Sequence, residues 1–127
     1  FETLAAPAQT GGHLVHCYAG KDRTGFAVAL LHALLGVHRD DVMADYMLTA
    51  TAGDNAARVA AGAKILRQRR PEADEEAIIT LMGVAPVWLD AAFATLDADF
   101  GGLEPFVGQH LGVNRTRRDA LVAALTL

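Results

Sequence analysis

The chain has 127 residues, of which 52% are hydrophobic and 20% are charged, and its formal net charge is −4. This length suits one domain with a substantial core, and the negative charge excludes a global attraction to nucleic acid or to an anionic membrane. No uncharged apolar run approaches the ~18 residues of a membrane span, and a single cysteine excludes an internal disulfide. We therefore expect no transmembrane segment and a cytoplasmic location, with export as the alternative that the sequence leaves open.

The first elements predicted are the end of a helix at residues 1–6 and, after a Pro- and Gly-containing break, a short buried strand at residues 12–16. A single strand cannot make a sheet, and a parallel neighbour needs its own crossover. The predicted fold class is therefore α/β, with the rest of the sheet outside this chain. Residues 1–127 are predicted to be the C-terminal, mostly helical part of one domain whose upstream part is absent.

About seven helices are predicted after the strand. The first, at residues 23–35, is apolar on nearly every side, which predicts a central, buried helix. In the predicted helix at residues 86–100, apolar residues recur every three or four positions, and we expect this stripe and the adjacent Trp88 to be core. Asp40 and Asn114 are the expected N-caps of their helices. The remaining helices are predicted at residues 40–47, 54–70, 74–82, 103–111 and 115–125.

The most informative stretch joins the predicted strand to the first long helix: His16-Cys17-Tyr18-Ala19-Gly20-Lys21-Asp22-Arg23-Thr24-Gly25. A turn from strand to helix directs successive backbone N–H groups toward one point, where an anion can bind. A thiolate is a suitable nucleophile for phosphorus, and these donors favour the thiolate form of Cys17. The planar guanidinium of Arg23 can hold two phosphate oxygens at once. The residues alone therefore predict phosphate chemistry with a cysteine nucleophile.

The same stretch supplies the predicted phosphate cradle. Gly20 allows the backbone to curl, Gly25 allows the helix to approach its neighbours, and the Thr24 hydroxyl can hydrogen-bond the sulfur as it leaves. The predicted phosphate-binding residues are Tyr18, Ala19, Gly20, Lys21, Asp22, Arg23 and Thr24.

Residues Cys17 to Arg23 match the Cys-x5-Arg signature of the cysteine-dependent phosphatase superfamily, which includes protein tyrosine and dual-specificity phosphatases. The longer string His-Cys-x-x-Gly-Lys-Asp-Arg-Thr-Gly resembles its bacterial branch of the mycobacterial protein tyrosine phosphatase B type, as do the Tyr46 segment and the turn at residues 111–113. The resemblance implies that Cys17 attacks phosphorus to form a phosphocysteine, that Arg23 binds the phosphoryl group, and that water hydrolyses the intermediate. It implies no metal and no organic cofactor.

The general acid is the main point on which this sequence departs from the better-known branches. Most tyrosine phosphatases use an upstream Asp, but the sixteen residues before Cys17 contain none. Either the acid lies upstream of Phe1, or it is Asp22, whose place beside Arg23 resembles that in myotubularin-type and Sac-type phosphoinositide phosphatases. We expect Asp22 to be the third catalytic residue; the alternative is that it only orients Lys21 or a water. Lys21 itself resembles loop lysines of phosphatases that accept phosphoinositides, so the expected partner is a phosphorylated protein or a phosphoinositide.

Other readings of the loop fit less well. A nucleotide P-loop needs a glycine where Val15 stands and a Ser or Thr where Asp22 stands. A sulfurtransferase of the rhodanese kind usually has a cysteine loop one residue shorter. The competing class is a catalytically silent fragment that binds phosphate or only supplies helices. The incomplete sheet argues that these residues are inactive without an upstream part of the same protein.

The basic helix expected from Arg58 to Arg70 has two readings. Cationic residues on a helix most often form a solvated face. The sharper alternative, which the resemblance supports, is a lid that moves over the site and attracts phosphorylated substrates.

Overall fold

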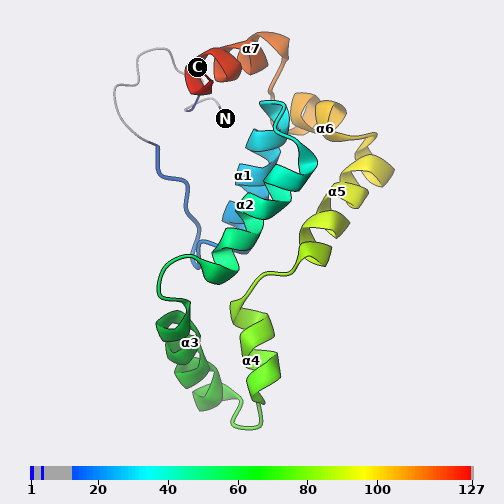
Figure 1. The fold of residues 1–127 in the computed structure, drawn as a ribbon. Coiled ribbons are helices and arrows are strands. Elements are labelled where there is room, and N and C mark those ends of the chain that lie inside the picture. Colours follow the sequence, from blue (N-terminus) through cyan, green and yellow to red (C-terminus); the bar gives the residue numbers. More distant parts are fainter. Residues whose placement is uncertain (2–3, 5–12, 127) are drawn as a thin grey trace.

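The computed structural model describes residue 1, residue 4 and residues 13–126. The helix end expected at residues 1–6 lies largely outside these described residues. The described part contains the seven helices expected from the sequence (Figure 1). They are α1 (Asp22–Leu34), α2 (Arg39–Thr51), α3 (Asn55–Arg69), α4 (Glu75–Met82), α5 (Pro86–Phe100), α6 (Leu103–His110) and α7 (Arg115–Leu125).

The strand expected at residues 12–16 is not present where the structure describes it. Residues 13–17 have no regular secondary structure, and the segment is not buried, because Leu14 is 87% exposed and Val15 is 42% exposed. A strand is defined by hydrogen bonds to a neighbouring strand, and no strand occurs among the described residues. The described part is therefore helical, and the α/β class with further sheet elsewhere stays a prediction.

Side-chain caps fix where several helices begin. The side-chain oxygens of Asp54, Asp74 and Asn114 accept hydrogen bonds from backbone N–H groups in the first turns of α3, α4 and α7. The cap expected for α2 was wrong: His38 is the N-cap, and its Nδ1 accepts a hydrogen bond from the backbone N–H of Asp40 at 3.3 Å. Asp40 lies instead in the first turn, where a carboxylate is favoured by the helix dipole.

Helix α1 is central to the body of the molecule, as its apolar sequence predicts. Its middle packs with α2 and α5 in a first core cluster, and its end packs with α6 and α7 in a second. Only Ala29, Leu30 and Leu34 of α1 are buried, so the helix is less enclosed than expected. The buried members are Ala29, Val42, Tyr46 and Leu89 in the first cluster, and Leu34, Val107, Val113 and Leu121 in the second.

The beginning of α1 contacts α2 very closely. A Cβ added at Gly25 would lie 2.8 Å from two ring carbons of Tyr46, a buried side chain of α2. This distance is shorter than real Cβ contacts allow, so any larger residue here would have to displace the Tyr46 ring. The expected role of Gly25, close approach to a neighbouring helix, is confirmed.

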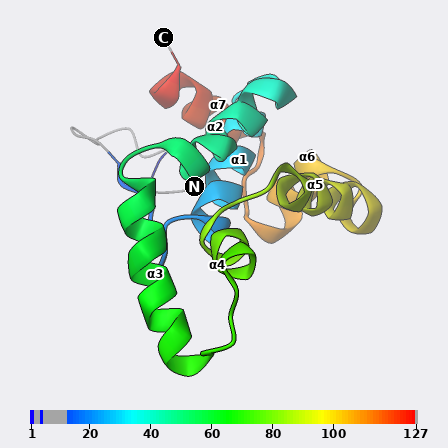
Figure 2. The ribbon, with the colours of Figure 1, turned by 60° about the horizontal axis from the view of Figure 1, so that its bottom comes forward.

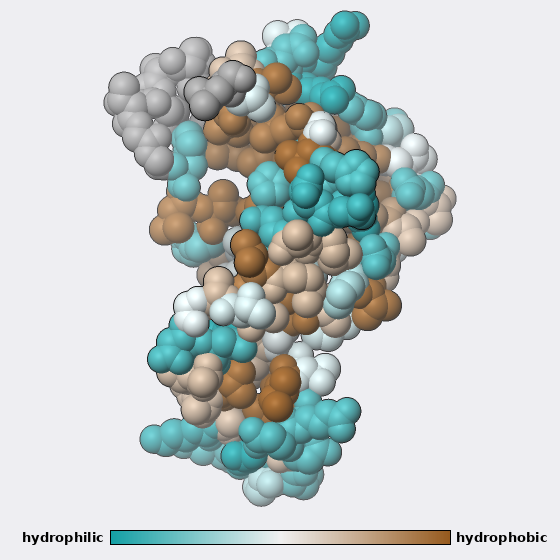
Figure 3. Space-filling view, in the orientation of Figure 1, coloured by the Kyte–Doolittle hydropathy of each residue, from teal (hydrophilic) through white to brown (hydrophobic). Residues whose placement is uncertain are grey.

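Helices α3 and α4 form a hairpin that projects from one end of the body (Figures 1 and 2). They pack on each other, Ala63 of α3 and Ile78 of α4 are buried, and Gly62 admits the side chain of Met82. Neither helix packs extensively against α1, α2, α5, α6 or α7. The far end of the hairpin is hydrophilic, whereas apolar atoms gather on the body beside the segment at residues 13–17 (Figure 3).

The hairpin returns to the body at the junction between α4 and α5. Gly83 ends α4, and Pro86 begins α5, where proline's fixed φ suits the first turn. The two helices differ in direction by 48°. Among the described residues no single helix has the length and hydropathy of a membrane span; α4 and α5 meet those criteria only as this bent pair.

We predict that Gly25→Ala destabilises the fold by about 1–2 kcal/mol. The added methyl group meets the Tyr46 ring, which costs about 1–3 kcal/mol for overpacking, while the gain in helix propensity returns up to about 1 kcal/mol. Chemical denaturation measures the change. Gly108→Ala in α6 is the matched control, because its Cβ would find only a 4.0 Å contact; this variant should be as stable as the parent or more so. Equal stabilities of the two variants would contradict the packing argument.

Candidate active site

The loop before α1 leads into a helix N-terminus that has no side-chain cap. Lys21 occupies the N-cap position of α1 but makes no side-chain cap, unlike the caps of α2, α3, α4 and α7. Gly20 has a φ of 69°, a conformation that favours glycine and curls the chain just before the helix. The first N–H groups of α1 are therefore available to an anion, in the positive field of the helix N-terminus.

Cys17 lies at the start of this loop as a partly exposed free thiol. Its surroundings lower its pKa to about 6. The largest cause is the Thr24 hydroxyl; partial burial opposes the shift, and backbone N–H groups of Thr24, Gly20 and Ala19 add to the lowering. A thiol with a pKa near 6 is mostly thiolate at neutral pH, which is the nucleophilic form.

The hydroxyl oxygen of Thr24 is buried and has no hydrogen-bond partner of normal geometry among the described residues. It is nevertheless the main cause of the low Cys17 pKa. Both observations hold if the hydroxyl proton turns to the sulfur when Cys17 ionises, because a thiolate is a better acceptor than a thiol.

Three other loop residues lie at the surface. Arg23 is exposed in the first turn of α1, and its side chain has no ion pair within the described chain. Tyr18 is 99% exposed, so its ring projects into solvent. Nδ1 of the His16 imidazole lies 3.3 Å from the carbonyl oxygen of Cys17, within hydrogen-bond distance of the loop backbone.

Lys21 points toward the α4–α5 junction. Its ammonium donates a 3.0 Å hydrogen bond to Asp22 and a 2.9 Å hydrogen bond to the backbone carbonyl of Gly83. It also lies 5.4 Å from the ring centroid of Trp88. The Lys21 side chain is 13% exposed, whereas that of Asp22 is 60% exposed. Asp22 therefore keeps a solvent-facing carboxylate while one of its oxygens is held.

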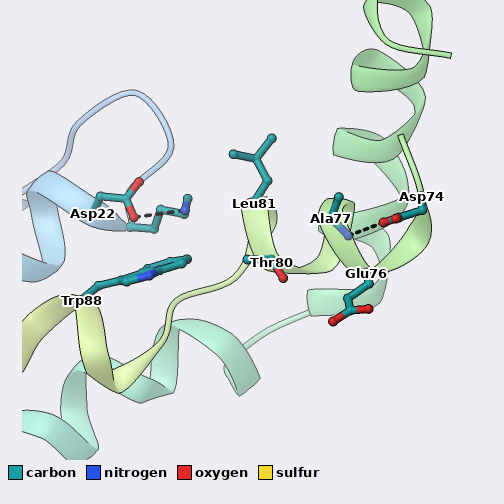
Figure 4. Close-up of a pocket in the computed structure, with 8 residues that line it drawn as sticks. Asp22, Asp74, Glu76, Ala77, Thr80, Leu81 and Trp88 are labelled. Carbon is teal, nitrogen blue, oxygen red and sulfur yellow. Dashed lines mark hydrogen bonds and ion pairs between the residues drawn. The ribbon is translucent and has the colours of Figure 1, made fainter. Parts of the chain in front are cut away.

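A cavity of about 770 Å³ flanks the loop. Asp22 and Trp88 lie on one side of it, and residues of α4, among them Thr80 and Leu81, lie on the other (Figure 4). Cys17 and Arg23 do not line this cavity. The space is therefore beside the predicted phosphate position, between the loop and the hairpin.

Trp88 corrects an expectation. It is 38% exposed and lines the cavity, so it is not core, although Leu89 and Leu96 of the same helix are buried. Trp88 stands one position before the apolar stripe that begins at Leu89, and that offset is the signal that could have excluded it from the core. Nothing in the sequence near Gly83 indicates that its carbonyl binds Lys21, because the two residues are 62 positions apart.

Tyr46 is a second residue whose place in the site is not apparent from the sequence. Burial raises the pKa of its phenol, and the negative charge of Asp22 raises that pKa further. Both residues line a smaller cavity of about 210 Å³, together with Trp88. The ring that fixes α1 through Gly25 therefore also lies within electrostatic reach of the predicted acid.

Some of the arginines of the basic helix α3 and its C-cap form ion pairs within the hairpin. Arg67 pairs with Glu75 at 2.6 Å, and Arg70 pairs with Glu72 at 3.7 Å, both in exposed positions. Arg58 donates hydrogen bonds to the Thr49 carbonyl and, on its own helix, to Asn55. The hairpin carries both signs of charge, and its role as a lid stays a prediction.

Comparison with known proteins agrees with the loop. A model of the tyrosine phosphatase family matches residues 1–127. A provisionally named tyrosine-protein phosphatase of Cupriavidus necator is 35% identical over 90% of this chain and 41% of its own length. Triple specificity protein phosphatase PtpB of Mycobacterium tuberculosis is 36% identical over 71% of this chain and 35% of its own length. This chain thus spans well under half the length of these relatives, and it belongs to the tyrosine phosphatase family.

Proposed function

We propose that the protein hydrolyses phosphate monoesters through a phosphocysteine formed on Cys17, with phosphotyrosine in proteins as the substrate class. The observation that carries the proposal is the lowered pKa of Cys17 at the start of an uncapped helix. Family membership supports the same reaction. The Mycobacterium tuberculosis relative is named a triple specificity phosphatase, which makes phosphoserine, phosphothreonine and phosphoinositides the alternatives to test.

The proposed reaction has two displacements at phosphorus. The Cys17 thiolate forms an S–P bond as the P–O bond to the leaving group breaks, and the leaving oxygen takes a proton from Asp22. A water then attacks phosphorus and gives a proton back to the Asp22 carboxylate. The S–P bond breaks, which releases inorganic phosphate and restores the thiolate. Backbone N–H groups of residues 18–24 and the Arg23 guanidinium hold the phosphoryl oxygens in both steps.

Asp22 is proposed as the acid because of its position. It lies in the first turn of α1, is largely exposed, and has one carboxylate oxygen held by Lys21. The carboxyl group thus has a defined orientation beside the flanking cavity, where a leaving group would enter. An acid supplied by a part of the protein upstream of Phe1 is the alternative.

The rest of the α/β fold is proposed to dock beside residues 13–16. This segment and α1 border an apolar hollow of about 420 Å³ lined by Leu14, Val15, Val28 and Leu31. Exposed Leu14 and Val15 would be covered by a strand paired with this segment. Slow amide exchange at residues 13–16 in a longer form of the protein supports this docking, and fast exchange there argues against it.

We predict that alkylation of Cys17 by iodoacetamide rises with pH around a midpoint near 6, because only the thiolate reacts. Thr24→Val removes the hydroxyl that lowers the pKa, so its midpoint moves above 6 and its rate at pH 6 falls. Thr24→Ser keeps the hydroxyl and is the matched control. A midpoint near the ordinary thiol value in the parent protein would remove the main support for the nucleophile.

We predict that Cys17→Ser lowers phosphotyrosine-peptide hydrolysis by at least about a thousandfold, since a serine hydroxyl is not ionised at this site. Arg23→Lys should lower kcat/KM by about a hundredfold because the paired donors are lost. Arg115→Lys, the same change at the first residue of α7, should leave activity unchanged. Steady-state rates on phosphotyrosine and phosphoserine peptides and on phosphoinositide vesicles identify the substrate class. Full turnover by Cys17→Ser would reject the mechanism.

We predict that Asp22→Asn lowers kcat by about 10²–10⁴-fold on a poor leaving group and by far less on p-nitrophenyl phosphate. A good leaving group needs no proton, so an acid matters little for it. Asparagine keeps an oxygen for Lys21, which preserves the loop contact. Asp41→Asn, in the first turn of α2, is the matched control. Equal losses on both substrates would exclude Asp22 as the acid.

A further inference from the structure

Lys21 makes contacts that no simple phosphate ligand would need. Its ammonium has Asp22 at 3.0 Å, the Gly83 carbonyl at 2.9 Å and the Trp88 ring at 5.4 Å, and the side chain is only 13% exposed. A carboxylate, a carbonyl and an aromatic face together satisfy an ammonium that has left bulk water. Lys21 is thus held in place before any substrate binds.

The partners of Lys21 belong to two separate parts of the molecule. Asp22 begins α1, in the body, whereas Gly83 ends α4, in the hairpin. The contact with Gly83 is partly buried, so solvent screens it less than a surface pair. Its counterpart across the base of the hairpin is Arg58, which donates to the Thr49 carbonyl of α2 at 2.6 Å. Because α3 and α4 otherwise pack mainly on each other, these two are, among the described residues, the side-chain hydrogen bonds that join the hairpin to the body.

We propose that Lys21 is a positioning residue that joins the phosphate loop to the α3–α4 hairpin and orients Asp22. Its side chain is not a phosphate ligand; only its backbone belongs to the cradle. The hydrogen bond from the Lys21 ammonium to the Gly83 carbonyl therefore sets the distance between the loop and the hairpin. The orienting part of this proposal rests on the proposed function of Asp22, whereas the joining part stands independently of it.

Two consequences separate this role from direct phosphate binding. Losing the link frees α4, so its amides exchange faster. Losing the orientation of Asp22 lowers kcat on substrates that need an acid, while KM and the inhibition constant of vanadate change little. A phosphate ligand would show the opposite pattern, with weaker vanadate binding and an unchanged hairpin.

The test uses the intact protein with Lys21→Met, Lys21→Arg and Lys64→Met. Methionine matches the length of lysine without its charge, and arginine keeps a donor that can reach the carbonyl and stack on Trp88. Lys64 is the only other lysine in the chain and lies exposed on α3, so Lys64→Met is the matched control. Hydrogen exchange at residues 78–82 reports on α4, and exchange at residues 117–121 of α7 verifies that each variant is folded.

We expect Lys21→Met to speed exchange in α4 by about tenfold, with α7 unchanged, and to lower kcat on a phosphotyrosine peptide by at least about tenfold. Lys21→Arg should recover most of both effects, and Lys64→Met should behave as the parent. Unchanged α4 exchange in Lys21→Met would overturn the proposal, as would a large rise in the vanadate inhibition constant. If the parent protein had no phosphatase activity, faster α4 exchange in Lys21→Met would still support the link alone.

Discussion

The close packing of α1 on Tyr46 is the constraint on which the rest of the site depends. Gly25 has no side chain, so the ring of Tyr46 can lie against the first turn of α1. That contact sets where the N-terminus of the helix points, and hence where its free N–H groups and Arg23 lie. The same ring is near enough to Asp22 for the carboxylate to raise the pKa of its phenol. One contact between two helices thus positions the backbone donors at the start of α1 and the backbone that carries Arg23 and the proposed acid.

The helical part of the fold was predictable because its signals are local. Asp54, Asp74 and Asn114 cap the helices they precede, and Pro86 begins α5, each by an interaction within a few residues. The strand at residues 12–16 was not predictable in the same way, because a strand needs a neighbour that the described residues do not provide. The predicted N-cap of α2 was wrong by two residues, because the His38 side chain supplies the acceptor that Asp40 was expected to supply.

In the candidate site, too, local features could be predicted from the sequence and contacts between distant residues could not. Cys17, Thr24 and the curl at Gly20 lie within eight consecutive residues, so their chemistry could be inferred from spacing, and the low pKa of the thiol agrees with it. The contacts of Lys21 with Gly83 and Trp88 could not, since they depend on how the α4–α5 junction returns to the loop. The sequence suggested that Lys21 would bind the additional phosphates of a phosphoinositide. In the structure its ammonium already contacts Asp22, the Gly83 carbonyl and the Trp88 ring.

The low pKa of Cys17 also exposes the protein to oxidants. A thiolate that is partly open to solvent reacts with peroxide to give a sulfenic acid. A second thiol commonly rescues such a cysteine by forming a disulfide, but this chain contains no other cysteine. Protection within these residues would have to come from a backbone nitrogen of the loop, which can close a sulfenamide ring. Without it, further oxidation to the sulfinic acid is irreversible. The low pKa that favours the thiolate of Cys17 therefore also makes this thiol the group in the loop most open to irreversible oxidation.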